Sequence, residues 1–157
     1  MEKLEEHDIF YMKKALNEAH KSSEELEVPV GAVIVYNKEI ISCGRNRRET
    51  LKNSLCHAEI EAIHYACLNL QRWRLTDCTM YVTLEPCPMC AGAIINSRIS
   101  RLVYGAFDKK SGSCNSVINL FDLPYNHKPL VCGGVLQNEC SEILSNFFKK
   151  LRKQWLS

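Results

Sequence analysis

The middle of the sequence alternates between helical and strand-like segments, and this alternation restricts the fold more than any other feature. Residues 57–70 and 86–96 read as helices, whereas residues 79–84 and 101–104 are short apolar runs typical of strands. Strands that alternate with helices form layers, in which the helices pack on a sheet with parallel pairs. We therefore predict an α/β fold for the central part of the chain.

The residues before and after this centre extend the sheet and its helical layers. The β-branched run at 30–36, the turn at Asn37-Lys38 and the strand-like run at 39–43 predict a hairpin, so the sheet is expected to be mixed. No repeat or linker interrupts the 157 residues, which favours one domain over 1–157. The other expected elements are a helix at 8–22, loops at 44–55 and 106–129, a strand at 130–132 and a helix at 141–155.

Nine cysteines stand out in an otherwise ordinary composition. They lie at positions 43, 56, 67, 78, 87, 90, 114, 132 and 140. An odd number of cysteines argues against a secreted disulfide framework. The acidic first residues contain no apolar run, and no segment is long and apolar enough for a membrane span. We therefore expect a cytoplasmic protein without a membrane segment, in which most cysteines pack as small apolar residues.

Charge is distributed unevenly along the chain. Residues 1–40 contain 5 Lys/Arg against 9 Asp/Glu, whereas residues 41–157 contain 15 against 9. Basic clusters of this kind either bind phosphates or form ordinary solvated surface. The clusters are Arg45, Arg47 and Arg48; Arg72 and Arg74; Lys109 and Lys110; and Lys149, Lys150, Arg152 and Lys153.

Cys87 and Cys90 are the first candidates for chemistry. They follow a predicted strand and open a predicted helix in the segment Pro86-Cys87-Pro88-Met89-Cys90. Residues three apart lie on nearly the same face of a helix, and the free N–H groups and dipole at its N-terminus favour thiolates. Taken alone, the pair fits a metal site, a thioredoxin-like dithiol or two core cysteines about equally well.

His57 and Glu59 shift the balance toward a metal. Together, His57, Cys87 and Cys90 provide three ligands of the type that zinc prefers and leave a fourth position open, as in catalytic rather than structural zinc sites. Cys56 is not expected to be a ligand, because neighbouring helical residues diverge by about 100°. Glu59 can accept the proton of an activated water and deliver it to a substrate, although acidic residues also occur in first helical turns for electrostatic reasons alone.

The two halves of this pattern combine into one signature. His57-x-Glu59, 26 intervening residues and Pro86-Cys87-x-x-Cys90 match the H-x-E and P-C-x-x-C signature of zinc-dependent nucleobase deaminases. Over residues 8–155 the chain also resembles the bacterial tRNA-specific adenosine deaminases. The resemblance rests on these motifs and on 27–32, 45–47, 75–77, 81–93, 104–106, Gly112, 126–127, 134–136 and 147–148.

The resemblance implies a cytidine deaminase-like fold, which is a three-layer sandwich with a mixed five-stranded sheet between helices. It also implies a homodimer with one Zn²⁺ per subunit and no organic cofactor. The implied reaction is the hydrolytic deamination of adenosine to inosine at wobble position 34 of a tRNA anticodon. The implied partner is therefore the anticodon stem-loop of tRNA.

The resemblance further assigns roles to individual residues. His57, Cys87 and Cys90 would bind zinc, and Glu59 would carry protons between water, adenine N1 and the leaving ammonia. Substrate-binding positions correspond to Asn46, Val30, Ala58, Asp108 and Phe148. Contacts with the tRNA backbone are expected from Arg47, Arg48, Lys110, Lys149, Lys150 and Arg152.

Two alternatives remain open at this point. A free guanine, cytosine or nucleoside deaminase would use the same zinc and Glu59 but would not need the basic C-terminal tail. A zinc-binding module or dithiol protein would not catalyse deamination at all. The chain departs from the family at Cys56, Arg45 and Cys114. Glu85, which precedes the Pro86-Cys87 step, is expected to support the metal ligands through hydrogen bonds.

Overall fold

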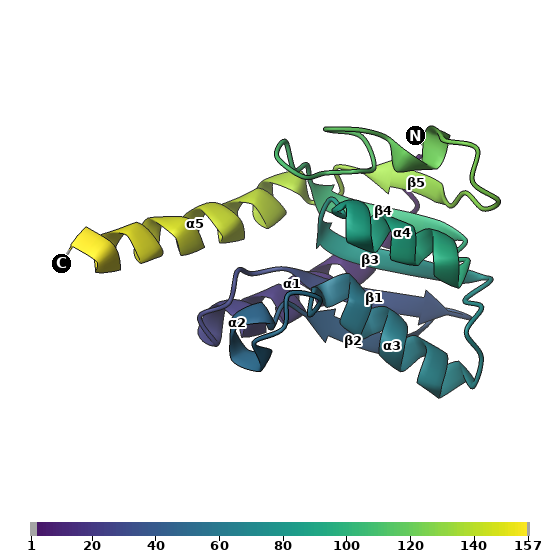
Figure 1. Ribbon diagram of the computed structural model, residues 1–157, viewed down its shortest axis with the longest axis horizontal. Coiled ribbons are helices and arrows are strands. Elements are labelled where there is room, and N and C mark those ends of the chain that lie inside the picture. Colours follow the sequence, from purple (N-terminus) through teal and green to yellow (C-terminus); the bar gives the residue numbers. More distant parts are fainter. Residues whose placement is uncertain (1–2, 157) are drawn as a thin grey trace.

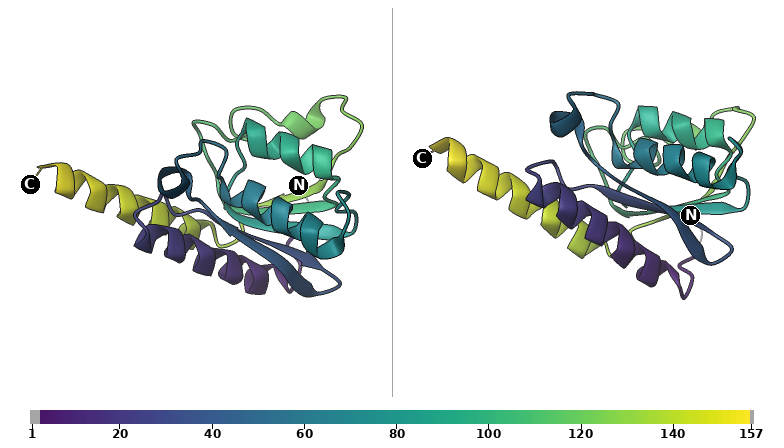
Figure 2. Two further views of the ribbon diagram at one scale, coloured as in Figure 1. Left: turned by 60° about the horizontal axis from the view of Figure 1, so that its bottom comes forward. Right: turned by 90° about the horizontal axis from the view of Figure 1, so that it is seen from below.

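The computed structural model describes residues 3–156, and its centre is a five-stranded sheet with helices on both faces (Figures 1 and 2). Residues 1, 2 and 157 of the expected 1–157 domain lie outside the described residues. The strand order is β2-β1-β3-β4-β5. β1 pairs antiparallel with β2 and β3, whereas β3–β4 and β4–β5 are parallel, which confirms the mixed sheet. The strands are β1 (Gly31–Tyr36), β2 (Glu39–Arg45), β3 (Cys78–Leu84), β4 (Arg101–Ala106) and β5 (Leu130–Gly133).

The helices divide between the two faces of the sheet. α1 (Asp8–Glu24) and α5 (Gln137–Leu156) lie on one face, and α3 (Ala58–Leu70) and α4 (Pro88–Ser97) lie on the other (Figure 2). This arrangement confirms the three-layer sandwich. Two short elements, α2 (Arg48–Leu51) and η1 (Leu120–Asp122), interrupt the connecting segments. Within residues 3–156, every helix is too short or too polar to cross a membrane.

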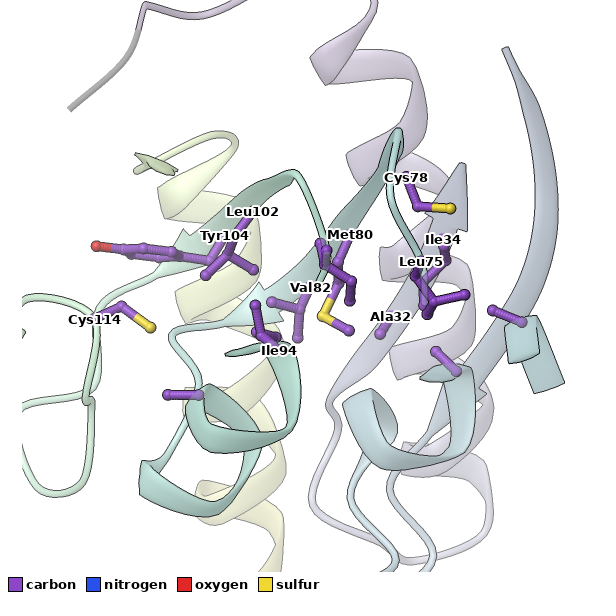
Figure 3. Close-up of a cluster of buried hydrophobic side chains, with 14 of the residues drawn as sticks. Ala32, Ile34, Leu75, Cys78, Met80, Val82, Ile94, Leu102, Tyr104 and Cys114 are labelled. Carbon is purple, nitrogen blue, oxygen red and sulfur yellow. The ribbon is translucent and has the colours of Figure 1, made fainter. Parts of the chain in front are cut away.

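Alternation along the central strands produces two separate cores. Successive side chains of a strand point to opposite faces, so Ala32 and Ile34 face α3 and α4 whereas Val33 and Val35 face α1. Figure 3 shows the first cluster between the sheet and α3 and α4. Its fully buried members include Leu75, Cys78, Met80, Val82, Ile94, Leu102 and Tyr104. Since both faces of β1, β3 and β4 are covered, these strands are mostly apolar rather than alternating with polar residues.

Two segments differ from the expectations drawn from the sequence. The expected loop at 44–55 contains the single turn α2, and α5 begins at Gln137 instead of residue 141. The last turns of α5 extend beyond the sheet, as Figure 1 shows. Phe148 and Trp155 in the second half of α5 are 41% and 85% exposed. The apolar residues that predict this helix are therefore not all buried in the core.

Candidate active site

One edge of the sheet gathers the ends of four strands and the beginnings of two helices. Gly31 at the start of β1 pairs with Arg45 at the end of β2, and Leu84 at the end of β3 pairs with Ala106 at the end of β4. α3 and α4 also begin at this edge, so their partly positive N-termini face the same space. Such an edge favours anionic groups and is where open α/β sheets commonly bind ligands.

His57, Cys87 and Cys90 meet at this edge. His57 is the N-cap residue of α3, Cys87 is the N-cap residue of α4, and Cys90 lies in the first turn of α4. The Nδ1 atom of His57 is 3.6 Å from the sulfur of Cys87 and 3.6 Å from that of Cys90. Tetrahedral zinc with ordinary Zn–N and Zn–S bonds places nitrogen and sulfur about 3.6 Å apart. The donor atoms therefore fit a metal of this kind.

The electrostatics of the cluster favour a metal-binding thiolate. The Cys90 thiol and the His57 imidazole stabilise the anionic form of Cys87 and lower the pKa of Cys87 to about 4. The same contact with Cys87, together with burial, raises the pKa of Cys90. The Cys87 sulfur in turn raises the pKa of His57. One thiolate is thus already stabilised beside the imidazole.

Cys56 does not join the cluster. Among residues 3–156, the ligand atoms that approach one another here belong to His57, Cys87 and Cys90. The backbone of Cys56 is used in the preceding loop, where its N–H donates to the Asn53 carbonyl and its own carbonyl accepts from the Arg47 N–H. The bend at 53–57 therefore fixes His57 while Cys56 remains apart from the three donor atoms.

Glu59 is buried beside the three candidate ligands. Its side chain is 4% exposed, and its carboxyl group contacts the Cys90 thiol. Burial raises the pKa of Glu59 to about 7. A carboxyl group in this position can exchange protons with a molecule bound next to the metal site.

A pocket of about 610 Å³ opens next to the cluster and contains most of the expected site residues. Its lining includes His57, Glu59 and Cys87. All five expected substrate-binding residues line the same pocket, namely Val30, Asn46, Ala58, Asp108 and Phe148. Arg48 and Lys110, expected to contact tRNA, line it as well. The pocket is therefore formed by the loops at the edge of the sheet together with α5.

The remaining cations expected to contact tRNA lie outside this pocket. Lys149, Lys150 and Arg152 are exposed in the second half of α5, and Lys150 borders a second groove between α1 and α5. Arg47 forms an ion pair with Glu61 of α3 at 2.9 Å. Arg45 is likewise bound to Glu25 at 2.7 Å, so its guanidinium is occupied within the protein. The basic cluster at 45–48 thus presents Arg48 to the pocket and uses the other two arginines in ion pairs.

Internal hydrogen bonds hold Asn46 at the pocket wall. Its side-chain amide donates to the Val28 carbonyl at 3.1 Å, and its side-chain oxygen accepts from the Arg48 N–H at 3.3 Å. Its backbone N–H donates to the Val30 carbonyl at 3.1 Å. An amide fixed in this way is pre-oriented for a ligand and needs little reorganisation on binding.

Four apolar residues of the pocket were not found from the sequence: Val28, Leu84, Phe107 and Leu144. Phe107 directly follows β4, and its ring packs edge-on against Tyr104 with the ring centroids 5.3 Å apart. The sequence signal that could have identified Phe107 as a pocket residue is its position directly after a strand that ends at the site. For Leu144, the helical stripe indicated a buried face of α5 without indicating that part of it would face the site.

Comparisons with known proteins agree with this geometry. The model of the MafB19-like deaminase family matches residues 5–152. A tRNA-specific adenosine deaminase of Bacillus subtilis (strain 168) is 51% identical over 148 residues, which cover 94% of this chain and 92% of the relative. A relative of the same name from Streptococcus pyogenes serotype M18 is 41% identical over 150 residues, covering 95% and 94% of the two chains.

Solved structures provide the corresponding evidence for the fold. A structure from work on A-to-I editing by tRNA:A34 deaminases at the wobble position has a TM-score of 0.84 and 44% identity, and the match covers 86% of this chain and 99% of that one. A guanine deaminase from Bacillus subtilis has a TM-score of 0.63 and 32% identity, with 76% and 74% covered. The expected cytidine deaminase-like fold is thereby confirmed. The chain belongs to the MafB19-like deaminase family and, within it, to the tRNA-specific adenosine deaminases.

Proposed function

We propose that this protein hydrolyses adenosine to inosine at wobble position 34 of a tRNA anticodon. The observation that carries the proposal is the buried Glu59 carboxyl beside the His57, Cys87 and Cys90 donor atoms, in a pocket that also contains Asn46. The identity of 51% to a tRNA-specific adenosine deaminase over nearly the whole chain supports the same substrate.

The residues divide the chemical work between them. His57, Cys87 and Cys90 would hold Zn²⁺, which would supply the Lewis acidity needed to make water a nucleophile near neutral pH. Glu59 accepts one proton from the attacking water and passes it to N1 of adenine, where it remains in inosine. Glu59 then takes the second proton from the oxygen added at C6 and passes it to the amino group, which leaves as ammonia. Burial keeps the Glu59 carboxyl away from bulk water, so the proton stays within the site.

The substrate-binding residues surround the position of the reacting base. An enzyme that acts on a base must take it out of the stack, and a tRNA anticodon loop already presents unstacked bases. Asn46 hydrogen-bonds the extruded nucleoside, whereas Val30 and Ala58 form its apolar walls. Asp108 contacts the nucleotide next to the target, and Phe148 lies on the helix that follows the anticodon loop; both residues line the same pocket.

Cations in and beyond the pocket bind the backbone of the same stem-loop. Arg48 and Lys110 lie at the pocket, and Lys149, Lys150 and Arg152 continue along the exposed part of α5. Phosphate contacts of this kind supply affinity and orientation without reading the sequence. Arg47 belongs to this set, although its ion pair with Glu61 limits its freedom to contact RNA.

The protein acts as a homodimer of single-domain subunits, with one Zn²⁺ per subunit, in the cytoplasm where its substrate is found. Exposed apolar side chains on the outer face of α3 support an interface: Tyr65 and Leu68 are 48% and 52% exposed. On α4, by contrast, Met89 and Ala93 are only partly exposed. A molar mass of twice the 18.0 kDa chain by light scattering supports the dimer, and a monomer would contradict it.

A substrate competition experiment tests the proposed function. Unmodified tRNA and free guanine, cytosine and adenosine are incubated with the protein, and each is analysed for loss of an amino group. We expect inosine in the tRNA and little turnover of the free bases. Turnover of a free base without inosine in any tRNA would contradict the proposal and favour the nucleobase deaminase.

A further inference from the structure

Glu85 is a buried carboxylate at the edge of the site that the proposed chemistry does not use. Its side chain is 2% exposed. The backbone N–H groups of Asp108, Cys114, Asn115 and Ser116 donate to it at 3.1, 3.1, 2.9 and 2.9 Å, and the Ser116 hydroxyl donates as well. All of these partners lie in the loop at 108–116, so Glu85 binds this loop and not the metal ligands.

The loop at 108–116 closes tightly around this carboxylate. A Cβ atom at Gly112 would overlap the Glu85 carboxyl group and the Asp108 carbonyl, so glycine is required at this close approach. Every polar group that contacts the Glu85 oxygens is a donor, so the loop surrounds a side chain that acts only as an acceptor.

A second contact links the loop to the segment that carries Cys87. The Ser113 N–H donates to the Pro86 carbonyl at 2.8 Å, and the Glu85 N–H donates to the Ala106 carbonyl at 2.8 Å. The backbone around Glu85 is thus already held between β4 and the loop without the help of its side chain. Replacing the carboxylate should loosen the loop at 108 and at 114–116, where the bonds to Glu85 are lost, while the Ser113 and Ala106 bonds hold the turn at Cys87.

The first half of the loop forms one side of the pocket mouth. Residues 108–111 all line the pocket. The Asp108 carboxylate accepts from the Lys110 N–H at 3.0 Å and from the Ser111 hydroxyl at 2.9 Å. These bonds stabilise a tight turn at residues 108–111. The bond from the Asp108 N–H to Glu85 anchors this turn to the end of β3.

We propose that Glu85 is a positioning residue that fixes the loop at 108–116 against the substrate, and that it serves RNA binding more than the chemical step. The inference rests on the proposed function, because the substrate that meets this loop is the tRNA anticodon. The backbone N–H groups bonded to the carboxylate point toward Glu85, and residues 108–111 line the pocket together with Glu85. Because this loop is already ordered in the free protein, RNA binding does not incur the loss of conformational entropy that ordering it would require.

Two substitutions and one control separate this role from a general effect on stability. Glu85→Gln keeps the size of the side chain but turns an NH₂ group toward backbone N–H donors, which cannot accept from it. Ser116→Ala removes a single hydroxyl donor and is a milder change that keeps every backbone bond. The control is Val103→Ala, a fully buried change on β4 that faces α1 instead of the site.

Each variant is measured for zinc content, for kcat and KM on an anticodon stem-loop, and for hydrogen exchange at the amides of 114–116. For Glu85→Gln we expect about tenfold higher KM, kcat within about threefold of the wild type, unchanged zinc and faster exchange at these amides. Ser116→Ala should shift KM and exchange in the same direction by less. Val103→Ala should leave KM and the exchange of these amides unchanged.

Other results would overturn the inference. Loss of zinc with a fall in kcat would show that Glu85 supports the metal ligands, as the sequence predicts. An equal rise in KM in Val103→Ala would show a general effect of reduced stability. If the wild type deaminates no RNA, the proposed function fails, and hydrogen exchange alone then decides whether Glu85 fixes the loop: unchanged exchange in Glu85→Gln would contradict it.

Discussion

The Nδ1 atom of His57 lies 3.6 Å from the sulfur of Cys87, although 30 residues separate them in the sequence. The two residues are the N-caps of α3 and α4, which begin at the same edge of the sheet. The site therefore depends on how two helices are placed on one sheet face, and a change that disturbs either helix start should disturb the site.

Replacing a candidate ligand should remove the metal. We expect about one Zn²⁺ per chain in the wild type and a large loss in Cys87→Ser, because two remaining donors hold zinc poorly. Cys56→Ser is the matched control, since Cys56 neighbours His57 but lies outside the cluster. Metal analysis of both purified variants measures the effect, and equal loss of zinc in the two would contradict the assigned ligands.

Removing the Glu59 carboxyl should affect the reaction and spare the metal. Glu59→Gln retains the shape of the side chain but cannot accept the proton of water, so kcat should fall by about 10²–10⁴-fold. Zinc content should stay at the wild-type value, since Glu59 is not among the three grouped donors. Single-turnover rates together with metal analysis check this expectation. A rate near that of the wild type would exclude Glu59 as the proton carrier.

Neutralising the exposed end of α5 should weaken tRNA binding without unfolding the protein. The triple variant Lys149→Ala, Lys150→Ala and Arg152→Ala removes three solvated cations from the projecting helix. We expect a higher KM for tRNA and a weaker dependence of binding on salt, with a slope that falls by about 1 for each phosphate that the variant no longer neutralises.

A matched control removes exposed charge elsewhere. The triple variant Lys3→Ala, Lys13→Ala and Lys128→Ala lowers the net charge by the same amount at sites away from the pocket and should change KM for tRNA far less. If both sets weaken binding equally, only the overall charge matters, and the proposed binding of RNA along α5 is wrong.

Stability should depend on pH through Asp8. Its fully buried carboxylate binds Arg101 at 2.7 and 2.9 Å and accepts from the Tyr81 hydroxyl at 2.8 Å. Burial raises the pKa of Asp8, but these bonds outweigh burial and lower it below 3.8. Because the pKa of Asp8 is lower in the folded than in the unfolded state, its ionised form stabilises the folded state at pH values above the unfolded-state pKa. This contribution is lost as the pH falls below 3.8.

Asp8→Asn should therefore reduce the free energy of unfolding by about 3–5 kcal/mol at pH 7, as expected when one partner of a buried ion pair is removed. The difference from the wild type should shrink in acid, where Asp8 of the wild type is protonated. Urea titrations over a range of pH values measure it. Asp77→Asn, an exposed change, is the control, and a difference that does not vary with pH would contradict the role of Asp8.

Much of the site could be predicted because its chemistry is local. His57, Cys87 and Cys90 each lie at a helix start that the sequence marks, at His57-x-Glu59 and at Pro86-Cys87. The mixed sheet followed from the hairpin at Asn37-Lys38 and the parallel unit after it. Local periodicity and turn residues are sufficient for such features.

The remaining features depend on tertiary contacts that local patterns do not contain. Arg45 has the sequence context of a free cation, but the fold places it 2.7 Å from Glu25. Glu85 has the context of a partner of the ligands beside it, but the loop at 108–116 returns from more than 20 residues away to bind it. The apolar stripe of α5 does not indicate where the sheet ends, so the exposure of its last turns could not be predicted.

The most direct test of the account is nucleoside analysis of unmodified tRNA after incubation with the protein, with position 34 of the anticodon read by sequencing. We predict inosine at that position with the wild type and almost none with Glu59→Ala, although both should contain zinc. Position-34 adenosine left unchanged by the zinc-loaded wild type, or inosine formed undiminished by Glu59→Ala, would contradict it.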